Sequence, residues 1–200
     1  ETVSGLMELE HPPVLGYIPF GSTNDCAATL ELPRKPRLAA AVAAGDGTPV
    51  PSDIGRLNGH TFVYVAAFGA FTDVSYQTPQ QLKNTFGHLA YVMEGLKSLP
   101  TIAPHRMTVT FDNEVITDSF AYGMVTNSVS VGGFKSISGR EMELDDGLFE
   151  VLLVRMPKNV FEFQAIVSAY LMQKVDERYM FFAKVSRIHF SSEEEISWTL

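Results

Sequence analysis

The stretch that most restricts the fold of this chain is LGYIPFGSTNDCAATL, residues 15–30. Residues 15–18 are largely apolar and predict a short buried strand, which the following proline ends. The polar residues 21–25 predict a tight turn, and good helix formers follow it. A strand, a Gly-Ser-Thr turn and a helix N-terminus leave N–H groups and hydroxyls available to an anion such as phosphate. A helix capped by Asn24 or Asp25 explains the same letters without a ligand.

Composition narrows the class of protein. The chain has 200 residues, 46% of them hydrophobic, which suits one large domain or one domain with part of another. Only 19% of the residues are charged, and the net charge of -8 argues against a nucleic-acid partner. The single cysteine, Cys26, excludes an intramolecular disulfide, fits a reducing compartment and is expected to pack rather than react.

No stretch predicts membrane insertion. The longest apolar run, residues 62–71, is much shorter than the roughly 20 residues that a spanning helix needs. The chain begins at Glu1 without a basic and then apolar leader. We therefore expect a cytoplasmic protein.

Periodic patterns predict a chain made mostly of strands after residue 50. Asn58-Gly59 indicates a hairpin turn. Helices are expected over 78–98 and over 160–173, the second capped by Asn159 with Glu162. Shorter helices are expected over 1–9 and 38–44. Strands are expected over 61–68, 106–111, 115 onward, 120–126, 150–156, 179–190 and 196–200.

Several of these segments resemble the diacylglycerol kinase-like lipid kinases, a bacterial group related to sphingosine kinases. The run IPFGSTNDCAATL is similar to the family's Pro-x-Gly-Thr-x-Asn-Asp-Phe segment, with Ser22 in place of Thr and Cys26 in place of Phe. The similarity spans the whole chain. It includes the segments SDIG with FVYVAAFG, GMVTNS, LDDGLFEVLLVRMPKN and SSEEEISWTL.

The resemblance implies an α+β fold that is mainly β, of the NAD kinase and diacylglycerol kinase type. Residues 1–50 would form the C-terminal part of an α/β ATP-binding domain. Residues 51–200 would form an antiparallel β-sandwich with attached helices, on the side of the lipid cleft and truncated at its end.

The same resemblance assigns roles near the nucleotide. Ser22 would contact ATP, since it matches the family's threonine. Asp25 matches a family acid that could hold a catalytic magnesium through water, although a helix cap remains an alternative. Asp53 resembles another supporting acid in the polar network that joins the metal to the active site.

A second Mg²⁺ site is implied in the turn that precedes the strand over 150–156. Its ligands would be the Asp146 carboxylate and the main-chain carbonyls of Glu143 and Leu148. Such hard oxygen ligands suit magnesium, which would pin the turn as a structural ion. An Asp-Asp-Gly turn without an ion is the alternative.

Two parts of the family's machinery are expected outside this chain. The glycine-rich nucleotide loop would lie upstream of Glu1, and the general base, in an Asp-Gly-Glu segment, just after Leu200. The chain would then carry no catalytic base, and we expect the fragment to be inactive alone. Residues 45–48, Gly-Asp-Gly-Thr, share letters with the nucleotide loop but are interpreted as a helix end and turn.

The function implied for the full-length protein is ATP- and Mg²⁺-dependent phosphorylation of a diacylglycerol-like lipid at its free hydroxyl. Peripheral contact with the inner face of the membrane would accompany it. A sphingoid-base kinase remains an alternative, as does a non-catalytic β-sandwich module that binds lipid or protein. An exposed edge strand could also pair with a second copy to give a homodimer.

Overall fold

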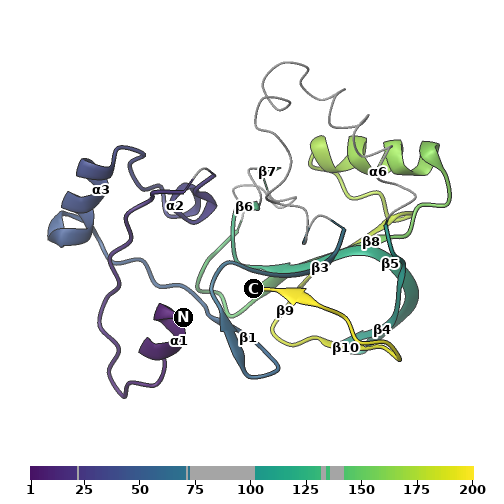
Figure 1. Ribbon diagram of the computed structural model, residues 1–200, viewed down its shortest axis with the longest axis horizontal. Helices are drawn as coiled ribbons and strands as arrows, with labels where there is room; N and C mark the ends of the chain where they lie inside the picture. The colour runs from purple at the N-terminus through teal and green to yellow at the C-terminus, as the bar shows by residue number, and fades with distance from the viewer. Residues whose placement is uncertain (22, 71, 73–101, 132–133, 136–141) are drawn as a thin grey trace. The chain divides into compact units, whose positions relative to one another are not determined.

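A computed structural model defines the fold of this chain, and its fold is mixed, with strands predominating (Figure 1). It forms two compact units. Unit 1 comprises Glu1–Val65 with Thr126–Phe149, and unit 2 comprises Ala66–Val125 with Glu150–Leu200. The predicted domain division at residue 50 and the sandwich arrangement stay predictions, and the helix expected over 78–98 lies outside the described residues. These are residues 1–21, 23–70, 72, 102–131, 134–135 and 142–200.

Unit 1 contains short elements joined by long connections. Its helices are α1 (Thr2–Leu6), α2 (Asp25–Thr29), α3 (Pro36–Ala41) and the π-helical turn η1 (Val42–Asp46). Its strands form two antiparallel pairs, β1 (Gly55–Leu57) with β2 (His60–Phe62), and β6 (Ser130–Val131) with β7 (Phe134–Lys135). The helix predicted over 1–9 is confirmed in shorter form. The helix predicted over 38–44 corresponds to α3 followed by η1, which together cover residues 36–46.

The β1–β2 hairpin follows the turn signal in the sequence. Asn58 and Gly59 both have positive φ, 47° and 89°, as a two-residue hairpin turn requires. Gly55 pairs with Phe62, and a Cβ at Gly55 would lie 2.2 Å from the Phe62 ring. Phe62 also packs edge-on against Phe149, with ring centroids 5.5 Å apart. Because Gly55 has no side chain, the Phe62 ring can occupy the space beside it.

The strand predicted over 15–18 is wrong. These residues are irregular, and Leu15 and Ile18 are 51% and 37% exposed. In the described part of the chain no strand pairs with this segment, so its N–H and C=O groups have no ladder to join. A short apolar run indicates that burying its side chains would be favourable. A strand also needs a neighbouring strand to pair with, and the run itself does not provide one.

Unit 2 is organised around a seven-stranded sheet. The order is β10-β4-β5-β3-β11, and β8 pairs with both β5 and β9. The pairings of β10 with β4, β4 with β5 and β11 with β3 are antiparallel, as predicted. The strands are β3 (Val65–Gly69), β4 (His105–Phe111), β5 (Glu114–Thr126), β8 (Phe149–Arg155), β9 (Met180–Val185), β10 (His189–Ser191) and β11 (Trp198–Thr199).

Three strand predictions differ from the structure. The single strand expected over 61–68 is two, β2 and β3, separated by a bend at residues 63–64. The two strands expected between 115 and 126 are one strand, β5, of 13 residues. The single strand expected over 179–190 is two, β9 and β10. In β4 the predicted alternation is confirmed, since Met107, Val109 and Phe111 are buried at 2%, 0% and 6% exposure.

An aromatic cluster fills the core of unit 2. Phe68 is fully buried, and its ring lies 4.8 Å from Trp198 and 6.2 Å from Phe190 between centroids. A Cβ at Gly123 would stand 2.2 Å from the Phe68 ring and 2.9 Å from the Leu153 side chain. The glycine in β5 therefore makes room for the phenylalanine in β3.

Helix α6 (Val160–Leu171) begins as its sequence predicts. Asn159 Oδ1 accepts hydrogen bonds of 3.0 Å from the N–H groups of Phe161 and Glu162. Glu162 in turn accepts a 2.8 Å bond from the Lys158 N–H.

Asn159→Ala removes the acceptor for two helix-end N–H groups, so we expect a loss of about 1 kcal/mol in unfolding free energy. Denaturant titration of the variant, with Asn159→Asp as the control that keeps the acceptor, measures this; equal losses in both would contradict the cap.

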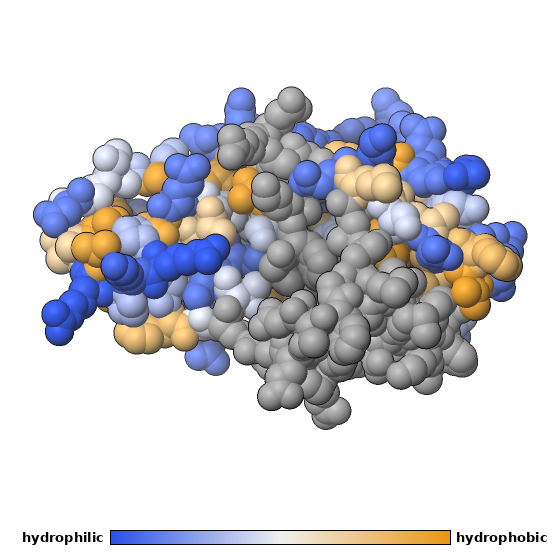
Figure 2. Space-filling view, turned by 90° about the horizontal axis from the view of Figure 1, so that it is seen from above, coloured by the Kyte–Doolittle hydropathy of each residue, from blue (hydrophilic) through white to orange (hydrophobic). Residues whose placement is uncertain are grey.

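Exposed large hydrophobic side chains occur in both units. Val14 and Phe20 in unit 1 are 76% and 81% exposed, and Phe161 and Met172 in unit 2 are 82% and 68% exposed. On the face in Figure 2, hydrophobic residues alternate with hydrophilic ones wherever the residues are described. Among the described helices, none has the length and apolar character needed to cross a bilayer.

Candidate functional site

The turn before α2 places Asp25 at the first helical position. Asn24 occupies the N-cap position with a left-handed backbone, φ 56° and ψ 45°, and its side chain makes no cap bond. Its Nδ2 instead donates to the Gly21 carbonyl oxygen at 2.5 Å. The prediction that Asn24 or Asp25 caps this helix is therefore wrong in its hydrogen bonding, and Ser22 lies outside the described residues.

Asp25 is a buried carboxylate with hydroxyl donors on both oxygens. It is 9% exposed. The Tyr64 hydroxyl donates to Oδ2 at 2.8 Å, and the Ser130 hydroxyl donates to Oδ1 at 2.5 Å. Hydrogen bonds to an ionised carboxylate are short and strong, so these two donors fix its orientation.

A polar segment at the end of β5 supports this arrangement. Thr126, Asn127 and Ser128 are 0%, 4% and 1% exposed. The Thr126 hydroxyl donates to the Tyr64 carbonyl oxygen at 2.7 Å, and the Ser128 hydroxyl donates to the Ser130 carbonyl oxygen at 2.7 Å. The two residues whose hydroxyls bind Asp25 are thus held through their own main chains.

Asp53 binds the turn over residues 144–148. Its N–H donates to the Leu144 carbonyl oxygen at 2.7 Å, and its Oδ2 accepts a 2.6 Å bond from the Gly147 N–H. Gly147 has φ 76°, a left-handed conformation that glycine adopts without strain. Asn127 Nδ2 also donates to the Leu144 carbonyl oxygen, at 2.8 Å. The predicted supporting acid therefore holds the predicted metal turn directly.

The chemistry of this turn fits a divalent cation. Residues 143–148 carry three carboxylates and no basic side chain. Asp146 Oδ1 accepts the Leu148 N–H at 2.9 Å, while its other oxygen has no partner in the described part of the chain. The predicted donors are one carboxylate and two main-chain carbonyls, hard oxygens of the kind that magnesium takes. Among the residues placed by the structure, no group of three His, Cys, Asp or Glu side chains is clustered for a metal.

Hydrogen bonds bring two of the predicted acids into one network. Asp25 and Asp53 are joined through Tyr64 and Asn127, all within unit 1. Sequence reasoning missed Tyr64, Asn127 and Ser130 as site residues. The available signal was the Thr-Asn-Ser run that directly follows the apolar end of β5, since polar residues there are either solvated or held by specific partners.

Cys26 lies beside Asp25 and has the properties of a packed side chain. Burial raises the pKa of its thiol above the ordinary value. The thiolate is the nucleophilic form, so a raised pKa lowers its population at neutral pH. The expectation that Cys26 packs rather than reacts agrees with this environment.

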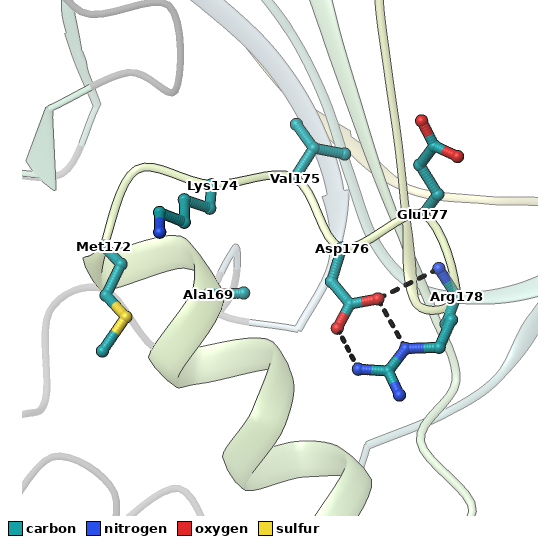
Figure 3. Close-up of a pocket in the computed structure, with 7 residues that line it drawn as sticks. All are labelled: Ala169, Met172, Lys174, Val175, Asp176, Glu177 and Arg178. Carbon is teal, nitrogen blue, oxygen red and sulfur yellow. Dashed lines mark hydrogen bonds and ion pairs between the residues drawn. The ribbon is translucent and has the colours of Figure 1, made fainter.

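An open hollow of about 530 Å³ lies in unit 2, at the C-terminal end of α6 (Figure 3). The Arg178 guanidinium is bound by the Asp176 carboxylate, at 2.9 Å from Nε and 2.6 Å from Nη2. That pairing lowers the pKa of Asp176 and neutralises the guanidinium. The hollow offers no buried, unpaired polar side chain to a ligand; its walls are Ala169, Met172, Lys174, Val175, Asp176, Glu177 and Arg178.

This chain is similar in sequence to known diacylglycerol kinases. The sequence profile of the diacylglycerol kinase catalytic domain matches residues 1–57. A diacylglycerol kinase of Bacillus subtilis is 32% identical over 201 residues, which cover 100% of this chain and 66% of that protein. One of Staphylococcus haemolyticus is 34% identical over 154 residues, covering 77% of this chain and 46% of that protein.

A solved structure is also similar. The crystal structure of a diacylglycerol kinase from Bacillus anthracis superposes with a TM-score of 0.70 at 25% identity. The match covers 98% of this chain and 62% of that one. The chain therefore belongs to the diacylglycerol kinase-like family. It spans about two thirds or less of the length of the relatives that it matches.

Proposed function

We propose that this chain is part of an ATP- and Mg²⁺-dependent lipid kinase that phosphorylates the free hydroxyl of a diacylglycerol-like lipid. The observation that carries the proposal is the Asp25 carboxylate. It is buried, it is held by two hydroxyls, and it lies in the segment that matches the catalytic domain of the family. Similarity to proteins named diacylglycerol kinase supports the same activity.

Phosphoryl transfer depends mainly on positioning and charge neutralisation. Asp25 would orient water on the nucleotide side of the site, and Ser22 would contact ATP. Magnesium, when bound, neutralises the charge that develops on the phosphates. Tyr64 and Ser130 keep the Asp25 carboxylate in one orientation, so no reorganisation is needed during the reaction.

The turn over 143–148 would hold a structural magnesium. Asp146 would supply its carboxylate, and Glu143 and Leu148 their main-chain carbonyls. Asp53 fixes the turn by accepting a hydrogen bond from the Gly147 N–H. Three carboxylates without a basic neighbour in this stretch support cation binding.

The full-length protein would act at the inner face of the membrane, where its lipid resides. The β-strands of residues 51–200 would form the sandwich that faces the lipid. The 200 residues alone would lack transfer activity, because the general base and the glycine-rich loop are assigned to other parts of the protein.

A kinase assay on the full-length protein tests the proposal. It is incubated with γ-labelled ATP, Mg²⁺ and, separately, diacylglycerol, sphingosine and undecaprenol in mixed micelles. We expect label in the diacylglycerol product only, with the 200-residue chain as the inactive arm. Label in sphingosine alone would change the acceptor to a sphingoid base. If the lipids bind but none is phosphorylated, the protein is a non-catalytic lipid-binding module and not a kinase.

A further inference from the structure

Tyr64 stands in the connection between β2 and β3, and its two polar ends face different partners. Its hydroxyl donates to Asp25 Oδ2 at 2.8 Å. Its carbonyl oxygen accepts a 2.7 Å bond from the Thr126 hydroxyl and a 3.3 Å bond from the Asn127 N–H. The main chain of Tyr64 is thus fixed by the end of β5, and the position of its hydroxyl follows from that.

Asn127 is the point at which several of these bonds meet. Its N–H holds the Tyr64 carbonyl, while its Nδ2 donates to the Leu144 carbonyl oxygen at 2.8 Å and, at a longer 3.4 Å, to that of Asp53. One side chain therefore touches both the metal turn and the acid that binds it. Hydrogen bonds thus link Gly147 to Asp53, Asp53 to Asn127, Asn127 to Tyr64 and Tyr64 to Asp25, each residue using one group toward one neighbour and another group toward the next.

The remaining polar atom of Asn127 is a second observation. Its Oδ1 is buried and has no hydrogen-bond partner among the residues that the structure describes. The residue as a whole is only 4% exposed. A buried acceptor left without a donor is costly, and such atoms ordinarily bind an ordered water. The Asn127 Oδ1 atom therefore calls for one more polar partner, such as an ordered water.

We propose that Tyr64 and Asn127 are positioning residues that transmit the state of the 143–148 turn to the Asp25 carboxylate. When the turn is ordered, Leu144 and Asp53 hold the Asn127 amide, and Asn127 holds the Tyr64 main chain. The Tyr64 hydroxyl then orients Asp25 toward the nucleotide. Nucleotide affinity consequently depends on an acidic turn that does not touch the nucleotide. This inference rests on the proposed function, because it assigns the roles of Asp25 and the turn accordingly.

Binding of MgATP to the full-length protein, measured by calorimetry, tests this coupling without any catalytic readout. Asp146→Ala loosens the turn at an exposed position, and we expect it to weaken MgATP binding about fivefold or more. In a Tyr64→Phe background the same change should alter binding less than about twofold, because the coupling passes through the Tyr64 hydroxyl. Independent sites would instead add and leave the fivefold effect unchanged. Tyr179→Phe, which removes a tyrosine hydroxyl in unit 2, is the matched control and should leave the fivefold effect intact.

Asn127→Leu is the second variant, of similar size but without the amide. It should abolish the Asp146→Ala effect as Tyr64→Phe does, with its thermal midpoint recorded to establish folding. If the Asn127→Leu variant fails to fold, the Tyr64→Phe comparison still tests the proposal, because Tyr64→Phe removes only one hydroxyl. An unchanged fivefold effect in Tyr64→Phe, or no effect of Asp146→Ala in the wild type, would overturn the proposal.

Lipid phosphorylation by the same preparations separates this inference from the proposed function. If MgATP binding shows the coupling but no lipid is phosphorylated, the proposed kinase activity is wrong and the positioning role of Tyr64 and Asn127 is supported. If a lipid is phosphorylated but MgATP binding shows no coupling, the kinase activity is supported and the positioning role of Tyr64 and Asn127 is wrong. Absence of MgATP binding in the wild type would overturn both.

Discussion

Replacing Asp25 by asparagine in the full-length protein is expected to lower lipid phosphorylation by about 10²–10³-fold, the range for loss of one preorganised electrostatic contact. Asparagine has nearly the same shape, so the fold around Tyr64 and Ser130 should persist. It carries no charge, however, and it cannot hold a hydrated cation as a carboxylate does. Initial rates at saturating ATP and lipid give the change in kcat.

The control for this experiment is Asp176→Asn. Asp176 pairs with Arg178 in the turn before β9 of unit 2, whereas the network of Asp25 belongs to unit 1. Exposed ion pairs contribute about 0–1 kcal/mol to stability, so activity should stay close to that of the wild type. Equal rates for Asp25→Asn and the wild type would show that Asp25 is not part of the catalytic site.

Truncating Phe68 to alanine is expected to give the largest loss of stability. The side chain is fully buried and contacts the rings of Trp198 and Phe190. Removing a buried phenylalanine costs about 3–5 kcal/mol, because the transfer free energy of the ring is lost and a cavity is left in the core. At a protein of this size about 2–4 °C is lost per kcal/mol, so the thermal midpoint should fall by roughly 6–20 °C.

Phe161→Ala is the matched control for that loss. Phe161 has the same side chain but is 82% exposed at the start of α6. Surface substitutions usually change stability by no more than about 0.5 kcal/mol. Scanning calorimetry of the two variants should therefore show a large shift for Phe68→Ala only. Similar shifts for both would contradict the assigned core of unit 2.

The elements predicted correctly from sequence are those that a few neighbouring residues determine. Asn58-Gly59 defines a hairpin because both residues accept positive φ. Asn159 and Glu162 define the start of α6 because they bond N–H groups within four residues. The alternation in β4 requires only the two-residue period of a strand.

The predictions that failed, and the residues that were missed, depend on distant partners. The apolar stretch 15–18 resembles a buried strand but has no pairing partner among the described strands. Tyr64 and Ser130 reach Asp25 from 39 and 105 residues away, and no local pattern encodes such contacts. The family resemblance identified Asp25 and Asp53, but the hydrogen bonds that join them became visible only in the structure. The roles of Ser22 and of the ligands in the metal turn stay predictions.

Crystallography of the full-length protein with Mn²⁺ and a non-hydrolysable ATP analogue would show whether unit 1 binds both the nucleotide and the metal. We expect an anomalous peak within ligand distance of the Asp146 carboxylate. It also predicts the triphosphate beside residues 21–25, with the Asp25 carboxylate still bound by Tyr64 and Ser130. A triphosphate bound elsewhere, with no peak at the 143–148 turn, would contradict the assignment of unit 1 as the nucleotide and metal side of a lipid kinase.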